Sequence, residues 1–226
     1  MKKMRVVEIA GNLMQKNDAI ARRLRERFAE QGTLVVNLLS SPGSGKTTLV
    51  EKTLERLASR YAFGVLVGDQ ATENDAQRLK RDGVNVHQIT TGAECRLDAD
   101  MIAESLKRWQ SRQFDVLVVE NVGNLICPAE YDLGEDLRAV LFSVTEGEDK
   151  PLKYPLAFNT SQVVLVTKID IAQAVGFNRE VAMTSIRQVN PGARVVEVSS
   201  RSGQGLDEWI ELLEERIRAK RLVAAK

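Results

Sequence analysis

Apolar and polar positions alternate along the chain in blocks, with short β-branched runs separated by longer stretches of helical spacing. Six apolar runs, each bounded by polar or glycine-containing segments, predict strands at residues 34–39, 63–67, 116–119, 140–144, 163–166 and 195–198. Helical spacing is found at residues 17–27, 48–58, 73–80, 99–109, 181–188 and 206–219. Because strands that alternate with helices are joined by crossover connections, the pattern predicts an α/β fold with a mainly parallel, doubly wound sheet.

The chain is long enough to bury one sizeable hydrophobic core. It has 226 residues, of which 43% are hydrophobic, so we expect a single domain over residues 1–226. A helical extension is expected at the N-terminal end, at about residues 1–32. A short C-terminal tail is expected at about residues 219–226, with fraying from Arg218 onward.

Charge and composition exclude several classes of partner. The 32 basic and 31 acidic residues give a net charge of +1, and the two signs are mixed along the helical stretches. Such a balance gives no long-range attraction to nucleic acid, and no apolar run is long enough to cross a bilayer. Residues 1–7 lack the apolar core of a signal peptide, and two cysteines are too few for a disulfide framework. We therefore expect a cytoplasmic protein that binds neither nucleic acid nor membrane.

The junction after the first predicted strand carries most of the functional information. Residues 40–47 read S-S-P-G-S-G-K-T, which is typical of a phosphate-binding loop that leads into a helix. The glycines let backbone N–H groups surround phosphate oxygens, Lys46 reaches the outer phosphates, and the Thr47 hydroxyl is placed to bind Mg²⁺. Ser40 stands where the usual pattern has glycine, so the G-K-T end carries the inference; the alternative is a Gly/Ser turn that binds nothing. The expected nucleotide-binding residues here are Gly43, Ser44, Gly45, Lys46, Thr47 and Thr48.

Acidic residues follow the second and third predicted strands. In an open parallel sheet, ligands collect at the carboxyl ends of the strands, so these positions are expected to lie near the phosphate loop. Asp69 and Glu120 are candidate Mg²⁺ carboxylates, Glu120 through water, and the Gly123 N–H is placed to sense a γ-phosphate. Asp75 is a candidate for positioning the attacking water, with Lys46 bearing much of the transition-state charge. The alternative for the acidic loop is plain solvated surface.

Two later loops favour guanine as the base. Residues 167–170 read T-K-I-D, in which the Asp170 carboxylate can accept from N1–H and the N2 amine of guanine, a donor pair that adenine lacks. Lys168 would lay its stem along the base. Thr167 replaces the asparagine of the familiar N-K-x-D motif, which weakens base discrimination. A short loop, Ser199, Ser200 and Arg201, follows the last predicted strand and is placed to meet the guanine O6. Together these segments favour GTP and GDP over adenine nucleotides.

Several strings in the chain resemble the hydrogenase nickel-incorporation GTPases, the HypB family. They are V-N-L-L-S-S-P-G-S-G-K-T-T, G-D-Q-A-T-E-N-D-A, T-G-A-E-C-R-L-D-A, E-N-V-G-N-L-I-C-P and V-T-K-I-D, and the match runs from about Asn17 to the C-terminal helix. The resemblance implies a P-loop NTPase of the SIMIBI type that is a slow, Mg²⁺-dependent GTPase. It also implies a homodimer promoted by GTP, which helps deliver Ni²⁺ to the large subunit of [NiFe]-hydrogenase. A zinc-containing accessory protein and a nickel metallochaperone are its implied partners.

The two cysteines are the candidate site for Zn²⁺ or Ni²⁺. Cys95 and Cys127 match positions where family members place thiolates between subunits, and a twofold axis would supply four sulfur ligands. Relatives usually read C-H at the first position, whereas here Arg96 follows and cannot bind metal. The alternative is that both cysteines are small buried hydrophobic residues. His87, the only histidine, is expected to be structural, and nickel storage is not expected.

Three other readings remain. A urease-type nickel GTPase has the same fold, but its C-P-H triplet is replaced here by Cys127, Pro128 and Ala129. A small-molecule kinase would use the same phosphate loop but gives T-K-I-D no role. A nucleotide-binding scaffold without turnover is the third. Within the leading interpretation, Lys153 is a candidate to act across a dimer, and the short distance in sequence from Gly123 to Cys127 suggests that nucleotide state reshapes the metal site.

Overall fold

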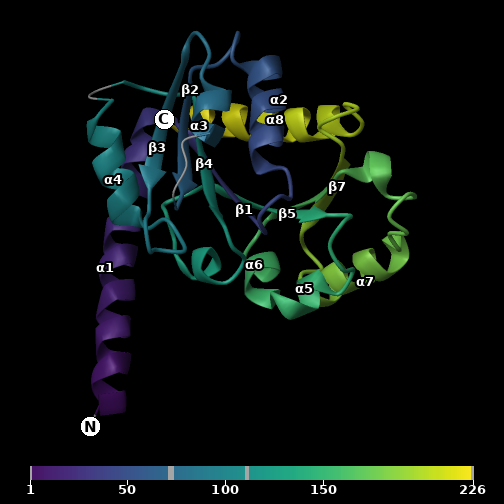
Figure 1. Cartoon of the computed structure of the whole chain (residues 1–226). Coiled ribbons are helices and arrows are strands. Elements are labelled where there is room, and N and C mark those ends of the chain that lie inside the picture. Colours follow the sequence, from purple (N-terminus) through teal and green to yellow (C-terminus); the bar gives the residue numbers. More distant parts are fainter. Residues whose placement is uncertain (1, 71–73, 110–111, 225–226) are drawn as a thin grey trace.

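The computed structural model describes residues 2–70, 74–109 and 112–224, and side chains from residue 11 onward (Figure 1). Its centre is a sheet in which every pairing between neighbouring strands is parallel, with strand order β3-β2-β4-β1-β5-β6-β7. The strands are β1 (Leu34–Ser40), β2 (Phe63–Asp69), β3 (Val84–Thr90), β4 (Val116–Gly123), β5 (Leu137–Ser143), β6 (Val163–Thr167) and β7 (Arg194–Val198). The predicted doubly wound α/β fold is confirmed.

Helices cover both faces of this sheet. They are α1 (Lys2–Gln31), α2 (Lys46–Leu57), α3 (Asn74–Leu79), α4 (Ala99–Lys107), α5 (Lys150–Lys153), α6 (Pro155–Asn159), α7 (Arg179–Val189) and α8 (Leu206–Ala224), with 3-10 turns η1 (Cys127–Glu130) and η2 (Ile169–Ile171). Alternate strand residues point to opposite faces. On one face they pack against α2, α3 and α8, and on the other against α1 and α4 or against α6 and α7. The central strands are therefore buried on both sides, which explains their continuous apolar sequence.

One strand was not predicted. β3 reads V-N-V-H-Q-I-T, in which polar residues interrupt the apolar ones, and most of its residues are only partly buried. It pairs with β2 alone and forms an edge of the sheet. Edge strands need less apolar surface than central strands, so the sequence signal was weak. His87 lies on this edge strand, with its ring centroid 6.4 Å from that of Trp109.

The C-terminal segment differs from the expected tail. α8 continues to Ala224, and residues 225–226 lie outside the described part of the chain, as does Glu73 at the start of the helix expected over 73–80. Two ion pairs fix the last turns of α8 to the sheet: Lys220 Nζ lies 2.5 Å from Asp136 Oδ1, and an Arg221 guanidinium nitrogen lies 2.5 Å from Asp115 Oδ1. These contacts explain why the helix does not end near Arg218.

Candidate nucleotide and metal site

The phosphate loop joins β1 to α2 at the carboxyl edge of the sheet. Gly43 and Gly45 have φ angles of 74° and 100°, a left-handed conformation that strains other residues, and Gly45 is the N-cap of α2. Lys46 is 8% exposed, and its Nζ donates a hydrogen bond to Ser40 Oγ at 2.8 Å. The serine that replaces the usual glycine therefore holds the ammonium group at the mouth of the loop. A glycine-containing loop that leads into the N-terminal end of a helix is the arrangement that favours anion binding.

A cavity of about 430 Å³ lies in front of this loop and brings the residues expected around the phosphates and Mg²⁺ together. Its lining includes Gly43, Gly45, Lys46, Thr47, Thr48, Asp69, Asp75, Glu120 and Gly123. Thr47 Oγ1 donates to Glu120 Oε1 at 2.6 Å, so the two expected Mg²⁺ ligands from β4 and α2 are in contact. A Cβ added to Gly123 would lie 3.1 Å from Pro42, which shows how closely the end of β4 approaches the phosphate loop.

The residues of this cavity fit a divalent cation. Glu120 is 3% exposed, and its Oε2 is a buried atom for which the described residues provide no hydrogen-bond partner. A buried carboxylate oxygen without a donor is costly unless a cation or water meets it. Thr47, Asp69 and Glu120 offer the oxygen donors that Mg²⁺ prefers.

Burial and the neighbouring charges shift two pKa values in opposite directions. Burial lowers the pKa of Lys46, while the charges of Glu120, Asp75 and Asp69 oppose that shift. Burial raises the pKa of Glu120 to about 7, against the opposing effects of Lys46 and of the hydrogen bond from Thr47. With no cation present, the Glu120 carboxyl therefore binds its proton more tightly than a solvated glutamate does.

Glu120 therefore makes the stability of the ligand-free protein depend on pH. Between the ordinary value of 4.5 and about 7, the folded state binds this proton more than the unfolded state does, so the free energy of unfolding falls as the pH rises through that range. The expected fall in the free energy of unfolding over that range is about 3 kcal/mol. We expect Glu120→Gln to remove this slope, measured by urea unfolding at pH 5 and pH 7.5 with chelator and no nucleotide. Equal pH dependence in the variant and the unaltered chain would contradict the assignment.

A second cavity, of about 510 Å³, lies beside the first and shares Gly45 and Thr48 with it. Its lining includes every residue expected around the base, namely Thr167, Lys168, Asp170, Ser199, Ser200 and Arg201, together with Ser44. Lys168 has a φ angle of 61°, the one non-glycine residue with positive φ in the described chain, at the turn between β6 and η2. Such strain is tolerated where the backbone must bend sharply, as expected at a binding loop.

Thr167 links the base loop to the phosphate loop. Its Oγ1 donates to the Ser44 carbonyl at 2.7 Å, and the Ser44 hydroxyl donates to Glu146 Oε1 at 2.7 Å. Glu146 also accepts from the Ser143 N–H and forms an ion pair with Lys150 at 2.8 Å. Thr167, which stands where the familiar motif has asparagine, therefore connects the two loops. Glu146 was missed by sequence reasoning, although it follows a predicted strand and the carboxyl-end rule applies to it.

Other residues of the phosphate cavity were also missed. Arg78, from α3, lines the cavity and lies 3.7 Å from Asp75 and 3.1 Å from Glu51. Asn121 lines it from β4 and is 1% exposed. A polar residue inside an apolar strand, as in V-E-N-V, is the sequence signal that would have found Asn121.

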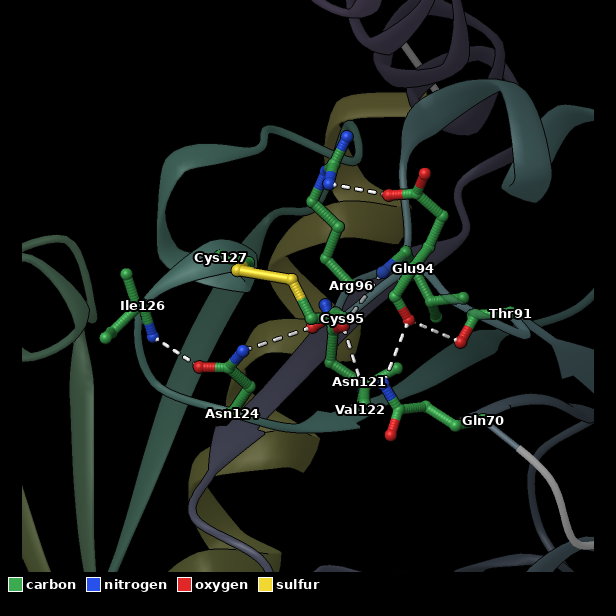
Figure 2. Close-up of a disulfide and its surroundings, with 11 residues drawn as sticks. Gln70, Thr91, Glu94, Cys95, Arg96, Asn121, Val122, Asn124, Ile126 and Cys127 are labelled. Carbon is green, nitrogen blue, oxygen red and sulfur yellow. Dashed lines mark hydrogen bonds and ion pairs between the residues drawn. A yellow bond between two sulfur atoms is a disulfide. The ribbon is translucent and has the colours of Figure 1, made fainter.

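The two cysteines lie side by side, as a shared metal site requires, but their sulfur atoms are covalently bonded to each other. A disulfide links Cys95 to Cys127, with a Cα–Cα distance of 6.2 Å (Figure 2). This corrects the expectation of two free thiolates and also the alternative of two separate buried hydrophobic residues, because a disulfide sulfur is not a thiolate ligand. Within the described residues, no cluster of three or more His, Cys, Asp or Glu side chains is arranged to hold a metal ion. Any metal at this pair requires its reduction.

Arg96 adds a second connection between the segments that carry the cysteines. Its guanidinium carbon lies 4.0 Å from the centre of the Tyr131 ring, and it forms an ion pair with Glu94 at 2.9 Å (Figure 2 shows the ion pair). A guanidinium over an aromatic face is an attractive contact. The cation that follows Cys95 is therefore held by an aromatic ring and a carboxylate.

None of the helices in the described ranges combines the length and apolar character needed to cross a membrane.

The sheet and its carboxyl edge define the class of the protein. A strand, a phosphate loop and a helix are combined with carboxylates at the ends of β2 and β4 and with a T-K-I-D loop after β6. This is the arrangement of a P-loop GTPase of the SIMIBI type.

Comparison with known proteins identifies the family. Residues 34–197 match the family described as CobW/HypB/UreG, nucleotide-binding domain. The chain is 44% identical over 214 residues to the hydrogenase maturation factor HypB of Escherichia coli strain K12, which covers 95% of this chain and 74% of that protein. A crystal structure of HypB from Helicobacter pylori in complex with nickel has a TM-score of 0.85 and 38% identity, covering 90% of this chain and 96% of that one. The chain belongs to the HypB family of hydrogenase maturation factors.

A more distant structure shares the fold alone. The 54 kDa protein of the signal recognition particle from Aeropyrum pernix, in complex with GDP, has a TM-score of 0.51 and 19% identity, covering 82% of this chain and 49% of that one.

Proposed function

We propose that this GTPase is a Mg²⁺-dependent metallochaperone that assists nickel insertion into [NiFe]-hydrogenase, with nucleotide state controlling both dimerisation and a cysteine metal site. The observation that carries the proposal is the short distance in sequence between two sites on one segment. Glu120 and Gly123 line the phosphate cavity, and Cys127 follows four residues after Gly123, beside Cys95. The nickel complex of the Helicobacter pylori relative supports nickel as the cargo.

The nucleotide would occupy the two adjoining cavities. The phosphate loop and Lys46 bind the phosphates, Asp170 and the Ser199–Arg201 loop recognise guanine, and Gly123 meets the γ-phosphate. Thr47, Asp69 and, through water, Glu120 would hold Mg²⁺, which would neutralise charge on the phosphates. 

In hydrolysis, this chain would act mainly through position and charge. Lys46, held by Ser40, faces the outer phosphates, and the closed loop replaces water with fixed donors. Asp75 orients the attacking water and lies 3.7 Å from Arg78. 

The metal site would form in the reduced protein. Reduction frees the two thiols, and a second copy across a twofold axis supplies two more, which makes four sulfur ligands suited to Zn²⁺ or Ni²⁺. The Arg96 charge is partly offset by Glu94 and Tyr131, which reduces its repulsion of an incoming ion. Exposed apolar side chains on α5 and α6, Leu152 and Leu156, are available for contact with the second copy, beside Lys153.

Partners follow from the same role. The hydrogenase large subunit is the proposed recipient of the metal, and a zinc-containing accessory protein and a nickel metallochaperone are the proposed co-workers, in the cytoplasm. A kinase would release little phosphate without an acceptor, so phosphate release from GTP alone, compared with ATP, separates the two activities.

The test of the metal site uses single serine variants. In reduced protein, we expect Cys95→Ser and Cys127→Ser each to weaken Ni²⁺ and Zn²⁺ binding at least about tenfold, because each removes a soft ligand. Competition with a chromophoric chelator measures the affinity, and gel filtration with GDP or a non-hydrolysable GTP analogue measures pairing. Thr184→Ala, on the exposed surface of α7, is the matched control. Undiminished metal binding in both cysteine variants would remove the cysteine site from the proposal.

A further inference from the structure

The Asn121 side chain lies between the nucleotide site and the cysteine pair. It follows Glu120 on β4 and is 1% exposed. Its Oδ1 accepts from the backbone N–H of Leu97 at 3.2 Å and of Val122 at 3.0 Å, and its Nδ2 donates to Asn37 Oδ1 at 3.3 Å. One amide therefore joins β1, β4 and the segment two residues after the first cysteine. Figure 2 shows Asn121 beside the disulfide segment.

A chain of buried polar groups continues from this amide to the second cysteine segment. Asn37 Nδ2 donates to Glu135 Oε1 at 3.1 Å, and Arg138 Nε donates to the same oxygen at 2.7 Å. The Arg138 guanidinium then donates to the carbonyl oxygens of Ala129 at 3.0 Å and Tyr131 at 2.8 Å, just after the second cysteine. We call Asn121, Asn37, Glu135 and Arg138 the polar chain. Both cysteine segments are thus tied to β1 and β4 through it.

Packing provides a second connection to the same strands. Leu97 is fully buried, and a Cβ added to Gly68 would lie 2.8 Å from its Cγ. Gly68 directly precedes Asp69 at the end of β2. A close-packed contact transmits displacement. A shift of the segment after Cys95 would therefore press the Leu97 side chain against β2 and would also move the Leu97 N–H relative to Asn121.

We propose that Asn121 is a positioning residue that couples the state of the Cys95–Cys127 pair, bonded or open, to the nucleotide site. The proposal rests on the proposed function, since it requires that GDP and GTP both bind. Closing the pair removes two protons and two electrons from the thiols and transfers them to a small-molecule disulfide, which becomes two thiols. Opening the pair frees the sulfurs for metal. Because Asn121 contacts the segments of both sites, the free energy of this change depends on how β1 and β4 are held by nucleotide.

The experiment measures the equilibrium of the disulfide with each nucleotide. Full-length protein is equilibrated in ratios of reduced to oxidised dithiothreitol, with Mg²⁺ and saturating GDP or a non-hydrolysable GTP analogue, and free thiols are then labelled and counted. We expect the equilibrium constant to differ between the two nucleotides by about fivefold or more, which is about 20 mV in midpoint potential. In Asn121→Ala, we expect the difference to fall below about twofold. A purely structural role would lower stability without removing the dependence on nucleotide.

Two further variants keep the test decisive. Asn17 is 5% exposed and holds both cysteine segments from the α1 side, by accepting from the Ala99 N–H at 2.9 Å and donating to the Asp132 carbonyl at 2.9 Å. Among the residues that the structure describes, none of its hydrogen bonds reaches β1 or β4. Asn17→Ala should shift the midpoint potential equally with both nucleotides and leave their difference intact. If Asn121→Ala does not fold, Asn37→Ser interrupts the polar chain on β1 and should also abolish the difference.

The outcomes separate this inference from the proposed function. Calorimetry of the reduced protein first establishes whether GDP and the GTP analogue bind; failure there removes the proposed function. If both bind and the disulfide equilibrium is the same with each, or if the difference persists in Asn121→Ala, the coupling through Asn121 is overturned while the proposed function stands.

Discussion

Replacing Lys46 with methionine is expected to lower kcat/KM for GTP hydrolysis by about 10²–10³-fold, the usual loss when one preorganised charge donor is removed. Lys46 is buried and its ammonium group is held by Ser40, so the charge is already fixed in the phosphate loop before a nucleotide binds. Methionine has a similar volume and carries no charge. Phosphate release over a range of GTP concentrations measures the effect, which should appear mainly in kcat because negative charge develops on the leaving β-phosphate oxygens as the bond to the γ-phosphoryl group breaks.

Two observations keep this result interpretable. Burial already lowers the pKa of Lys46, so removing the charge relieves a desolvation cost, and the variant should fold. Lys107→Met is the matched control, because Lys107 is an exposed lysine on α4 that pairs only with Glu104 in the described structure. Its kcat/KM should match that of the unaltered chain. A Lys46→Met enzyme with the same kcat/KM would mean that the charge in this loop does not act on the reacting phosphate.

Much of the site was predictable because one geometric rule covers it. Parallel strands place their carboxyl ends at one edge of the sheet, and apolar runs reveal where such strands end. The residues after β1, β2, β4, β6 and β7 were therefore expected to meet, and they line two adjoining cavities. Glu146, after β5, obeys the same rule and was missed because its loop matches no familiar motif. The roles of these residues in binding and catalysis stay predictions.

The cysteine pair and the polar chain were beyond the reach of local sequence patterns. Cys95 and Cys127 are 32 residues apart, and only the loops after β3 and β4 bring them together. Asn37 and Asn121 interrupt apolar strands, which signals a buried polar contact but not its partner. Their hydrogen bond depends on the parallel register that places β1 beside β4. Pairings of this kind depend on tertiary structure, so spacing alone does not reveal them.

Asp170→Asn is expected to reverse the preference of the enzyme for the base. The Asp170 carboxylate, at the base cavity, is suited to accept from N1–H and the N2 amine of guanine. An asparagine amide would point a donor at that amine and lose one of the two bonds to a charged acceptor. Since each such bond contributes about 1.5–3 kcal/mol, the loss of one should lower GTP affinity by about 10- to 150-fold. Xanthosine triphosphate has a carbonyl oxygen where guanine has the amine, so it should bind the variant better than GTP does.

Competition against a fluorescent guanine nucleotide measures both affinities in the presence of Mg²⁺. Asp100→Asn, an exposed carboxylate on α4 away from both nucleotide cavities, is the matched control and should retain the preference for GTP. The substitution at Asp170 leaves the phosphate loop unaltered, so hydrolysis of bound xanthosine triphosphate should proceed at a rate close to that of GTP in the unaltered chain. This combination distinguishes loss of base recognition from loss of folding, because a damaged site would bind neither nucleotide. An Asp170→Asn variant that still prefers GTP would show that the base lies elsewhere, and the assignment of the second cavity to guanine would be wrong.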